Sequence, residues 1–419
     1  MKSAVIISDM RLFSLLTAIQ LARDSEGDCI VSSLFLTNND YGSFTNKYYK
    51  KIKLFFLSLL FRRVIIIEAS ASSADKVSGK VYHTIGIVSS LISITKDSRA
   101  TTEKYPLVAR QLEQLERGAE DVARFLEKND YKKVFLFNGR FASTYSIVAR
   151  MKIIGIQLYY FEWGSIPFHF ILKNYPTHDF ETDGRRTIAC YENGILLPSF
   201  IKYEASKCGY VKYKLENSFS KAYSKINTKP VDVLICLGSQ HEYLSLDMFD
   251  NIDDLEFVRR VYAKYGRERK YSIRAHPNQI QDRSWRSNSD QIKEFAATID
   301  ATYYDPEDST DTHGLLERAA VCVALHSSIS IDAFILGTPV DIFVRNKYSE
   351  FIDYIEKKSS SGSRLEILAQ IMTISNLINH YPLAPQLCII YKLLVHIDNI
   401  FTKVTDIKDA KAYDSWYLL

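Results

Sequence analysis

Cysteine is scarce in this chain, and its spacing excludes the common structural uses of that residue. The 419 residues include six cysteines, no two of them close enough for a Cys-x-x-Cys pair: Cys29, Cys190, Cys208, Cys236, Cys322 and Cys388. Without clustered thiols we expect no metal site. Cys236 and Cys322 occur within apolar runs and are predicted to be buried thiols. The pattern favours a reducing compartment.

Long hydrophobic runs are also missing. The segment MKSAVIISDMR has four consecutive apolar residues before Asp9 and Arg11, so no signal peptide is predicted. The longest dense apolar run, LFFLSLLF at 54–61, is too short to span a bilayer. We therefore expect a cytoplasmic protein.

A strong charge of either sign is absent. The 53 basic and 49 acidic residues leave a formal net charge of +4, too small to indicate a nucleic-acid-binding protein. Several catalytic motifs are missing as well, namely G-x-G-x-x-G, the Walker lysine motif, G-x-S-x-G and H-E-x-x-H. The composition is otherwise ordinary for a soluble globular protein, and the length allows two or more domains.

The stretch 271–343 carries the clearest pattern in the chain. A β-rich run, YSIR, ends on the sequence AHPN, and a second run at 321–325 ends on the sequence HSS. A helix is predicted from about residue 329 to residue 336, where glycine and proline stop it, and the chain then returns as a strand. This alternation predicts a parallel sheet, in which ligands bind beyond the carboxyl ends of the strands.

The amino-terminal half repeats this pattern of strand, polar tip and helix. Predicted strands at 134–137 and 157–161 end on the polar sequences NGR and EWG. Residues 200–230 are polar and do not continue the alternation of strands and helices, so we place the domain connection there. We expect an α/β protein. Two Rossmann-like domains, 1–225 and 226–419, would face each other across a cleft, and a carboxyl-terminal helix would pack back on the first domain.

The first candidate site binds an anion at the strand tips of the second domain. The imidazole of His276, before Pro277, can hydrogen-bond a phosphate or ribose, or give a proton to a leaving phosphate. Ser327 and Ser328 lie where a helix begins, so backbone N–H groups and two hydroxyls can converge on an anion. The other predicted members are Arg274, Asn278, Asp332 for ribose hydroxyls, Ser239 and Gln240.

Each of these residues also has an ordinary structural alternative. His276 can be a turn histidine without a ligand, and the two serines can simply cap a helix. Asp332 can be a first-turn carboxylate that interacts with the helix dipole.

The second candidate site follows the strands of the first domain. Arg140, in the turn Asn138-Gly139-Arg140, can hold an anionic substrate group, and a solvated turn is the alternative. Asp9 joins Asn138 and Arg140 as a candidate for binding an acceptor.

Glu162 is the candidate general base. Desolvation by the ring of the adjacent Trp163 would raise the pKa of its carboxyl and suit it to deprotonate a hydroxyl group. An ion pair with a basic neighbour is the alternative. Asp179, in the sequence His178-Asp179, is a second acid/base candidate.

Residues 47–63 combine six basic side chains with the run LFFLSLLF and contain no acid: Lys47, Lys50, Lys51, Lys53, Arg62 and Arg63. Such a segment favours peripheral contact with an anionic membrane, here the inner face of the cell membrane. A buried strand or helix with solvated flanks is the alternative.

The order of five segments resembles that of bacterial capsule and surface-polysaccharide glycosyltransferases of the GT-B type: FNGRFASTYSIVAR, YYFEWGS, LGSQHEY, IRAHPN and DTHGLLERAAVCVALHSSISIDAFILGTPVDIF. The resemblance covers about 130–345. The His-Pro and Ser-Ser pairs are similar to those of bacterial sialyltransferases and capsule Kdo transferases, which use CMP-activated sugars. This resemblance implies that His276, Ser327 and Ser328 contact the nucleotide phosphate. Asp332 stands where many sugar-nucleotide transferases have glutamate.

The resemblance therefore implies a metal-independent glycosyltransferase without a cofactor. It would move a sugar from a nucleotide-sugar donor in the second domain to a glycan or lipid-linked glycan acceptor, such as capsule or lipopolysaccharide, in the first. A CMP-sugar is favoured over UDP- and GDP-sugars. Teichoic-acid glycerophosphotransferases carry a similar Ser-Ser…Asp helix, so transfer from a CDP-alcohol is an alternative, and a non-catalytic glycan- or nucleotide-binding subunit is another.

Overall fold

The computed structural model describes residues 2–8, 12–37, 64–67, 85–164, 168–194, 230–243, 252–325, 327–358 and 364–392. Asp9, the basic segment 47–63 and the expected domain boundary at 225/226 lie outside these residues. Within them, no helix is both long enough and apolar enough to cross a membrane.

The first sheet comes mainly from the amino-terminal half of the chain. Its strands lie in the order β12-β6-β5-β4-β1-β2-β3, with the bounds β1 (Ser3–Ile6), β2 (Asp28–Ser32), β3 (Val64–Ile67), β4 (Lys133–Phe137), β5 (Gln157–Trp163), β6 (His169–Lys173) and β12 (His380–Pro382). Strands β1 to β5 pair in parallel, whereas β6 and β12 pair antiparallel at one edge.

The helices of this domain pack on the sheet or on one another through apolar faces: α1 (Leu12–Asp24), α2 (Ser33–Thr37), α4 (Ile85–Thr95), α5 (Pro106–Lys128) and α6 (Tyr145–Ile153). In α5, proline at the first turn suits the helix start, and Leu112, Leu115, Ala119, Val122 and Leu126 are buried at helical spacing. The opposite face of α5 is charged and meets water.

The second sheet is entirely parallel, as the pattern at 271–343 predicts. Its strands lie in the order β11-β10-β7-β8-β9, with the bounds β7 (Val231–Cys236), β8 (Tyr271–Arg274), β9 (Thr302–Tyr304), β10 (Ala319–Ala324) and β11 (Val340–Ile342). The connections contain α10 (Gln240–Tyr243), α11 (Asp254–Tyr265), the 3-10 helix η3 (Pro277–Gln281), α12 (Trp285–Thr298), α13 (Thr312–Arg318) and α14 (Ile329–Leu336). Cys236 and Cys322 are buried thiols on adjacent strands, which confirms that prediction.

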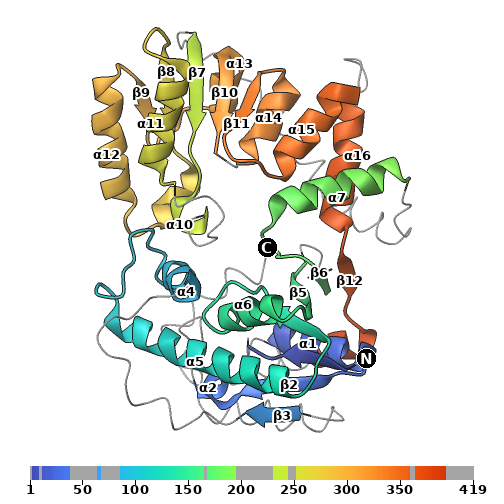
Figure 1. The fold of residues 1–419 in the computed structure, drawn as a ribbon. Helices are drawn as coiled ribbons and strands as arrows, with labels where there is room; N and C mark the ends of the chain where they lie inside the picture. The colour runs from blue at the N-terminus through green and yellow to red at the C-terminus, as the bar shows by residue number, and fades with distance from the viewer. Residues whose placement is uncertain are drawn as a thin grey trace.

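The two halves exchange short elements, so neither is continuous in sequence (Figure 1). Helix α7 (Phe180–Glu192) follows the first sheet but packs against α15 (Lys347–Lys358) and α16 (Arg364–Leu377) of the second half. Strand β12 then returns to pair with β6, and Leu383 and Leu387 enter the first core. Two Rossmann-like β/α domains arranged in this way make up the GT-B architecture, which confirms the expected fold class.

A polar junction joins the end of α4 to the start of α12. The backbone N–H of Ser98 donates to Asp282 Oδ1 (3.1 Å), and Asn288 Nδ2 donates to Ser98 Oγ (3.0 Å). The guanidinium of Arg99 reaches Gln291 Oε1 at 2.6 Å. Figure 1 shows α4 directly beneath this edge of the second domain. These bonds fix one domain against the other at a single corner.

The Asp97 carboxyl is the charged centre of this junction. Burial by itself would raise its pKa, but hydrogen bonds from Lys104 Nζ, Ser284 Oγ, Tyr105 Oη and the Arg99 N–H outweigh burial and lower the pKa to about 2. Its side chain is fully enclosed. Because the folded-state pKa lies below the unfolded value, the carboxylate contributes stability above about pH 4 and loses it as the pH falls towards 2.

We expect Asp97→Asn to lower the free energy of unfolding at neutral pH by about 2 kcal/mol, the equivalent of its pKa shift. Between about pH 5 and pH 2, the stability of the variant should also fall less steeply than that of the wild type. Urea unfolding across that range measures both effects. Asp130→Asn removes an exposed carboxylate of a surface ion pair and serves as the control. Equal stability of Asp97→Asn and wild type would contradict the assignment.

Candidate functional site

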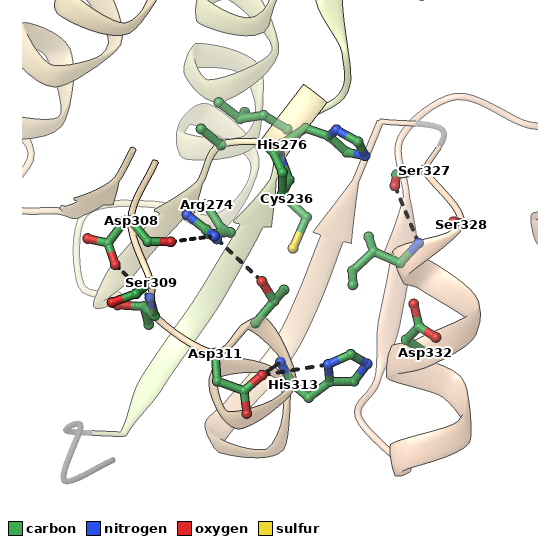
Figure 2. A pocket seen from close by; sticks show the side chains of 16 residues that line it. Cys236, Arg274, His276, Asp308, Ser309, Asp311, His313, Ser327, Ser328 and Asp332 are labelled. Carbon is green, nitrogen blue, oxygen red and sulfur yellow. Dashed lines mark hydrogen bonds and ion pairs between the residues drawn. The ribbon is translucent and has the colours of Figure 1, made fainter. Parts of the chain in front are cut away.

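A pocket of about 600 Å³ opens at the carboxyl ends of β7, β8 and β10. This volume is in the range of small-molecule sites. The structure brings together here six of the residues predicted for the anion site: Arg274, His276, Pro277, Ser327, Ser328 and Asp332. Figure 2 shows Ser327, Ser328 and Asp332 along one side of the pocket, with Asp308 and Ser309 on the opposite side.

His276 is held in one orientation by its own turn. The backbone N–H of Asn278 donates to His276 Nδ1 (3.1 Å), and Pro277 begins η3 immediately afterwards. Because Nδ1 accepts this bond, the proton of the neutral ring lies on Nε2. The histidine therefore presents a hydrogen-bond donor on the side of the ring away from its own backbone.

The two serines form the amino-terminal end of α14. Ser327 Oγ accepts a bond from the Ile329 N–H (3.3 Å), whereas Ser328, at the N-cap position, makes no side-chain cap bond. The interpretation of both serines as plain helix caps thus holds for Ser327 only. The N–H groups of Ser330 and Ile331 donate to the backbone oxygens of Ser327 (3.2 Å) and Ser328 (3.0 Å), so an anion at this end of α14 would meet the positive end of the helix dipole and the Ser328 hydroxyl.

Asp332 lies one turn into α14 and is almost fully buried, at 3% exposure, although it lines the pocket. A carboxylate at this depth accepts hydrogen bonds and does not meet bulk water. Its position, next to the anion-binding end of the pocket, matches a group that receives hydroxyl donors.

The guanidinium of Arg274 is committed to the protein itself. It donates to the backbone oxygen of Asp305, to that of Asp308 (3.0 Å) and to Thr312 Oγ1 (3.3 Å). These bonds differ from the expected grip on a phosphate, because the planar fork is already matched to acceptors of the 305–312 loop. Arg274 holds one wall of the pocket in place.

This wall is the part of the site that sequence reasoning missed. It comprises Asp308, Ser309, Thr310, Asp311, Thr312 and His313. The Asp311 carboxylate accepts from the N–H groups of His313 (3.1 Å) and Gly314 (3.2 Å) and so caps α13. A usable signal existed: the polar sequence DSTDTH follows the predicted strand 302–304, just as AHPN follows 271–274.

Three residues predicted for this site do not line the pocket. Ser239 and Gln240 are buried at the start of α10, which packs towards α4. Asn278 is exposed, and its N–H orients His276. After β7 and β8, only the residues nearest the strand end line the pocket, and the chain then turns away from it.

A second polar cluster lies at the strand tips of the first domain. Asn138 Nδ2 is 3.0 Å from Glu162 Oε1 and 3.0 Å from His178 Nε2. The structure thus brings together two predicted residues, Asn138 and Glu162, with His178, which was considered only through its neighbour Asp179. Asn138 has a left-handed backbone, with φ of 59°, which asparagine tolerates better than most residues.

Trp163 does not desolvate Glu162 as expected. Its indole N–H donates to Ser14 Oγ (3.1 Å), and its ring packs on Phe137. Consecutive residues of a strand point to opposite faces, so the ring and the Glu162 carboxylate lie on different sides of β5. The proposed cause of a raised pKa is therefore wrong.

His178 is kept neutral by its surroundings. Burial lowers its pKa well below the ordinary value, and the charges of Arg140 and Lys173 lower it further. Arg140 itself stacks on the ring of Phe141, with its guanidinium carbon 4.6 Å from the ring centroid. This arrangement places a fixed positive charge beside the cluster.

Asp179 serves as the cap of α7. Its carboxylate accepts from the Thr182 N–H (3.0 Å) and from Thr182 Oγ1 (2.8 Å). Both oxygens are thus engaged, which favours a structural role over the predicted role as an acid or base.

Charged groups of the two domains meet at Lys96, in the junction. Burial lowers the pKa of Lys96, while Glu242 on α10 raises it and Arg140 of the first domain lowers it. Glu242 in turn has a pKa raised by burial and lowered by Lys96. Residues from the strand tips of both domains therefore interact electrostatically here. Across the described ranges, no group of three His, Cys, Asp or Glu side chains is arranged to hold a metal ion.

No protein-family model and no curated protein matches the chain. Solved structures resemble it at low identity. KpsC of Thermosulfurimonas dismutans, a beta Kdo 2,7 transferase, is 12% identical with a TM-score of 0.36 over 63% of this chain and 82% of that chain. UDP-GlcNAc 2-epimerase of Neisseria meningitidis bound to UDP-GlcNAc is 11% identical with a TM-score of 0.25, covering 94% and 100%. S. aureus MnaA with UDP is 10% identical with a TM-score of 0.27, covering 90% and 91%. Similarity this low transfers no activity.

We expect Arg274→Lys to loosen the pocket wall while the sheet stays folded. A lysine keeps the charge but cannot reach three separate acceptors, so the 305–312 loop loses hydrogen bonds that hold it to Arg274, each worth about 0.5–1.5 kcal/mol. Hydrogen exchange followed by mass spectrometry should show faster exchange in 305–313. Arg260→Lys, in an exposed ion pair on α11, is the control. Unchanged protection of 305–313 would show that Arg274 does not hold this wall.

Proposed function

We propose that the protein is a glycosyltransferase that moves a sugar from a nucleotide donor, with a CMP-sugar favoured, to a surface-glycan acceptor. The observation that carries this proposal is the pocket at the strand tips, where His276 Nε2, two serine residues and the start of α14 surround one volume. A donor phosphate there would receive hydrogen bonds from several sides and meet the positive end of the helix dipole.

The charges of the pocket favour a donor with few phosphates. Three carboxylates, from Asp308, Asp311 and Asp332, line it together with the single guanidinium of Arg274. A phosphodiester of the CMP type carries one negative charge, whereas a UDP- or GDP-sugar brings two into the same surroundings. Asp332 would accept hydrogen bonds from ribose hydroxyls.

The leaving phosphate needs stabilisation as charge develops on it. The His276 Nε2–H, the Ser328 hydroxyl and the positive end of the α14 dipole would supply this from fixed positions, and such electrostatic stabilisation is the largest contribution in many transfer reactions. The acceptor would bind in the first domain, where Glu162 is the general base that takes the proton of the attacking hydroxyl. Asn138 and Arg140 would position the acceptor.

Nucleotide titrations test the donor site. We expect CMP or CDP to bind the wild-type protein, and His276→Ala and Ser327→Ala/Ser328→Ala each to bind at least tenfold more weakly. A hydrogen bond to a charged group contributes about 1.5–3 kcal/mol, so tenfold is the lower limit. Calorimetry with CMP, CDP, UDP and GDP measures each affinity.

Asp253→Ala is the matched control, because Asp253 caps α11 in the same domain and accepts from the Glu256 N–H (2.7 Å). It should cost about 1 kcal/mol of stability and leave nucleotide affinity unchanged. If all four nucleotides bind the pocket variants as they bind wild type, the phosphate site is wrong. If UDP or GDP binds best, the site stands and the choice of donor fails. Turnover of a CDP-alcohol in place of a CMP-sugar would favour glycerophosphate transfer.

Glu162→Gln tests the base. We expect the variant to keep its fold and its nucleotide affinity while turnover falls by roughly two to four orders of magnitude, the usual weight of general-base catalysis. Transfer assays with CMP-, CDP-, UDP- and GDP-linked donors measure turnover, and thermal unfolding measures stability. Near-normal turnover would move the role to Asp179 or Asp9, whereas a large loss of stability would support a structural role for Glu162.

A further inference from the structure

We propose that His178 is a positioning residue that, through the side-chain amide of Asn138, fixes the orientation and ionisation of Glu162. The inference rests on the proposed role of Glu162 as the base. It assigns a task to a histidine that otherwise has none and explains why an asparagine stands at a strained backbone position.

The backbone of Asn138 is held on both sides. Its N–H donates to the Phe161 oxygen (3.0 Å), and its own oxygen accepts from Thr177 Oγ1 (3.4 Å). The residue is 97% buried, because its exposed fraction is 3%. With φ at 59° and the backbone fixed, its side chain is directed to one place and has little freedom except rotation of the amide.

The two neighbours of the amide decide which way it faces. An amide nitrogen only donates, and Nδ2 has two hydrogens, one for Glu162 Oε1 and one for His178 Nε2. A rotated amide would set Asn138 Oδ1 against the carboxylate, which is repulsive. His178 Nε2 must therefore be an acceptor, and the proton of its neutral ring lies on Nδ1.

The charges around His178 keep it in this state. Arg140 approaches from the loop after β4, and Lys173 approaches from β6, where it pairs with Asp183 on α7 at 2.5 Å. The neighbouring Asp179 carboxylate is bonded to Thr182. A protonated His178 would present Nε2–H to the amide N–H and force the amide to rotate. Two cations beside a buried imidazole oppose that protonation.

The benefit passes to Glu162. A hydrogen bond donated to a carboxylate stabilises its ionised form and lowers its pKa, so the base stays deprotonated and points in one direction. Without His178, the amide can turn its oxygen towards Glu162, and that stabilisation is lost. His178 thus acts on Glu162 through the Asn138 amide.

The first test is the tautomer of His178 in the full-length protein with 15N-labelled histidine. Long-range imidazole 1H–15N spectra identify the tautomer, and His178→Gln identifies the resonances by their loss. We expect neutral His178 with its proton on Nδ1 from about pH 8 to pH 5.5. A proton on Nε2, or titration near the ordinary histidine pKa of about 6.5, would overturn the inference.

The second test follows the titration of Glu162 by the chemical shift of its 13C-labelled carboxyl, assigned with Glu162→Gln. We expect the pKa of Glu162 to rise by about one unit in His178→Ala and in Asn138→Ala. His178→Gln should restore most of the shift, because its amide oxygen can accept the same hydrogen. Tyr175→Phe, which removes a hydroxyl bonded to Asp183 in the same neighbourhood, should leave the Glu162 pKa unchanged.

An unchanged Glu162 pKa in both alanine variants would overturn the inference, as would an equal rise in Tyr175→Phe, because the effect would then be general loosening. Neither measurement needs a substrate. If the Glu162 pKa does not respond but Glu162→Gln is inactive, the proposed role of His178 is wrong and the proposed function stands. If Glu162→Gln is active, Glu162 is not the base, and the proposed function itself has to be revised at that point.

Discussion

A buried polar group must find a hydrogen-bond partner, and this constraint shapes both candidate sites. Arg274 is buried below the pocket, so its guanidinium captures two backbone oxygens and a threonine hydroxyl of the 305–312 loop. The loop becomes a fixed wall as a consequence. Asn138 is buried at the other site, and its amide nitrogen links Glu162 to His178. In each case, one buried side chain organises groups that lie far apart in the sequence.

Local pattern was sufficient for the α/β class and for six of the sixteen residues that line the pocket. The alternation of β-rich runs and helices predicts the parallel strands β8 and β10, and the rule that ligands bind beyond strand ends predicts that His276 and Ser328 line one volume. Both follow from backbone geometry, which depends on residues close in sequence. The sequence Asp-Ser-Thr after β9 follows the same rule, because these polar residues come after a strand end and line the pocket.

Partners across long sequence distances were beyond local pattern. The bonds of Arg274 join residues more than 30 positions apart, and Asn138 meets His178 across 40 positions. The residue types alone do not identify such pairs, because an arginine can donate hydrogen bonds to a phosphate or to a backbone carbonyl equally well. Trp163 is different. The alternation of side chains along a strand already places it opposite Glu162, so the expectation that its ring desolvates the carboxylate was avoidable.

The division of tasks between the domains follows from the exchanged elements. Each site is assembled within one domain, so each can form independently of the distance between them. The relative position of the sites then depends on the few contacts that cross: the Asp97 junction, α7 on α15 and α16, and β12 on β6. These contacts lie at separate places along the chain. The junction is built from charged and polar groups, and the contact of α7 with α15 includes an ion pair between Lys358 Nζ and Glu192 Oε1 (3.9 Å). At the junction the Asp97 carboxylate is enclosed and accepts several hydrogen bonds, so this corner holds the two domains together more firmly than exposed polar contacts would.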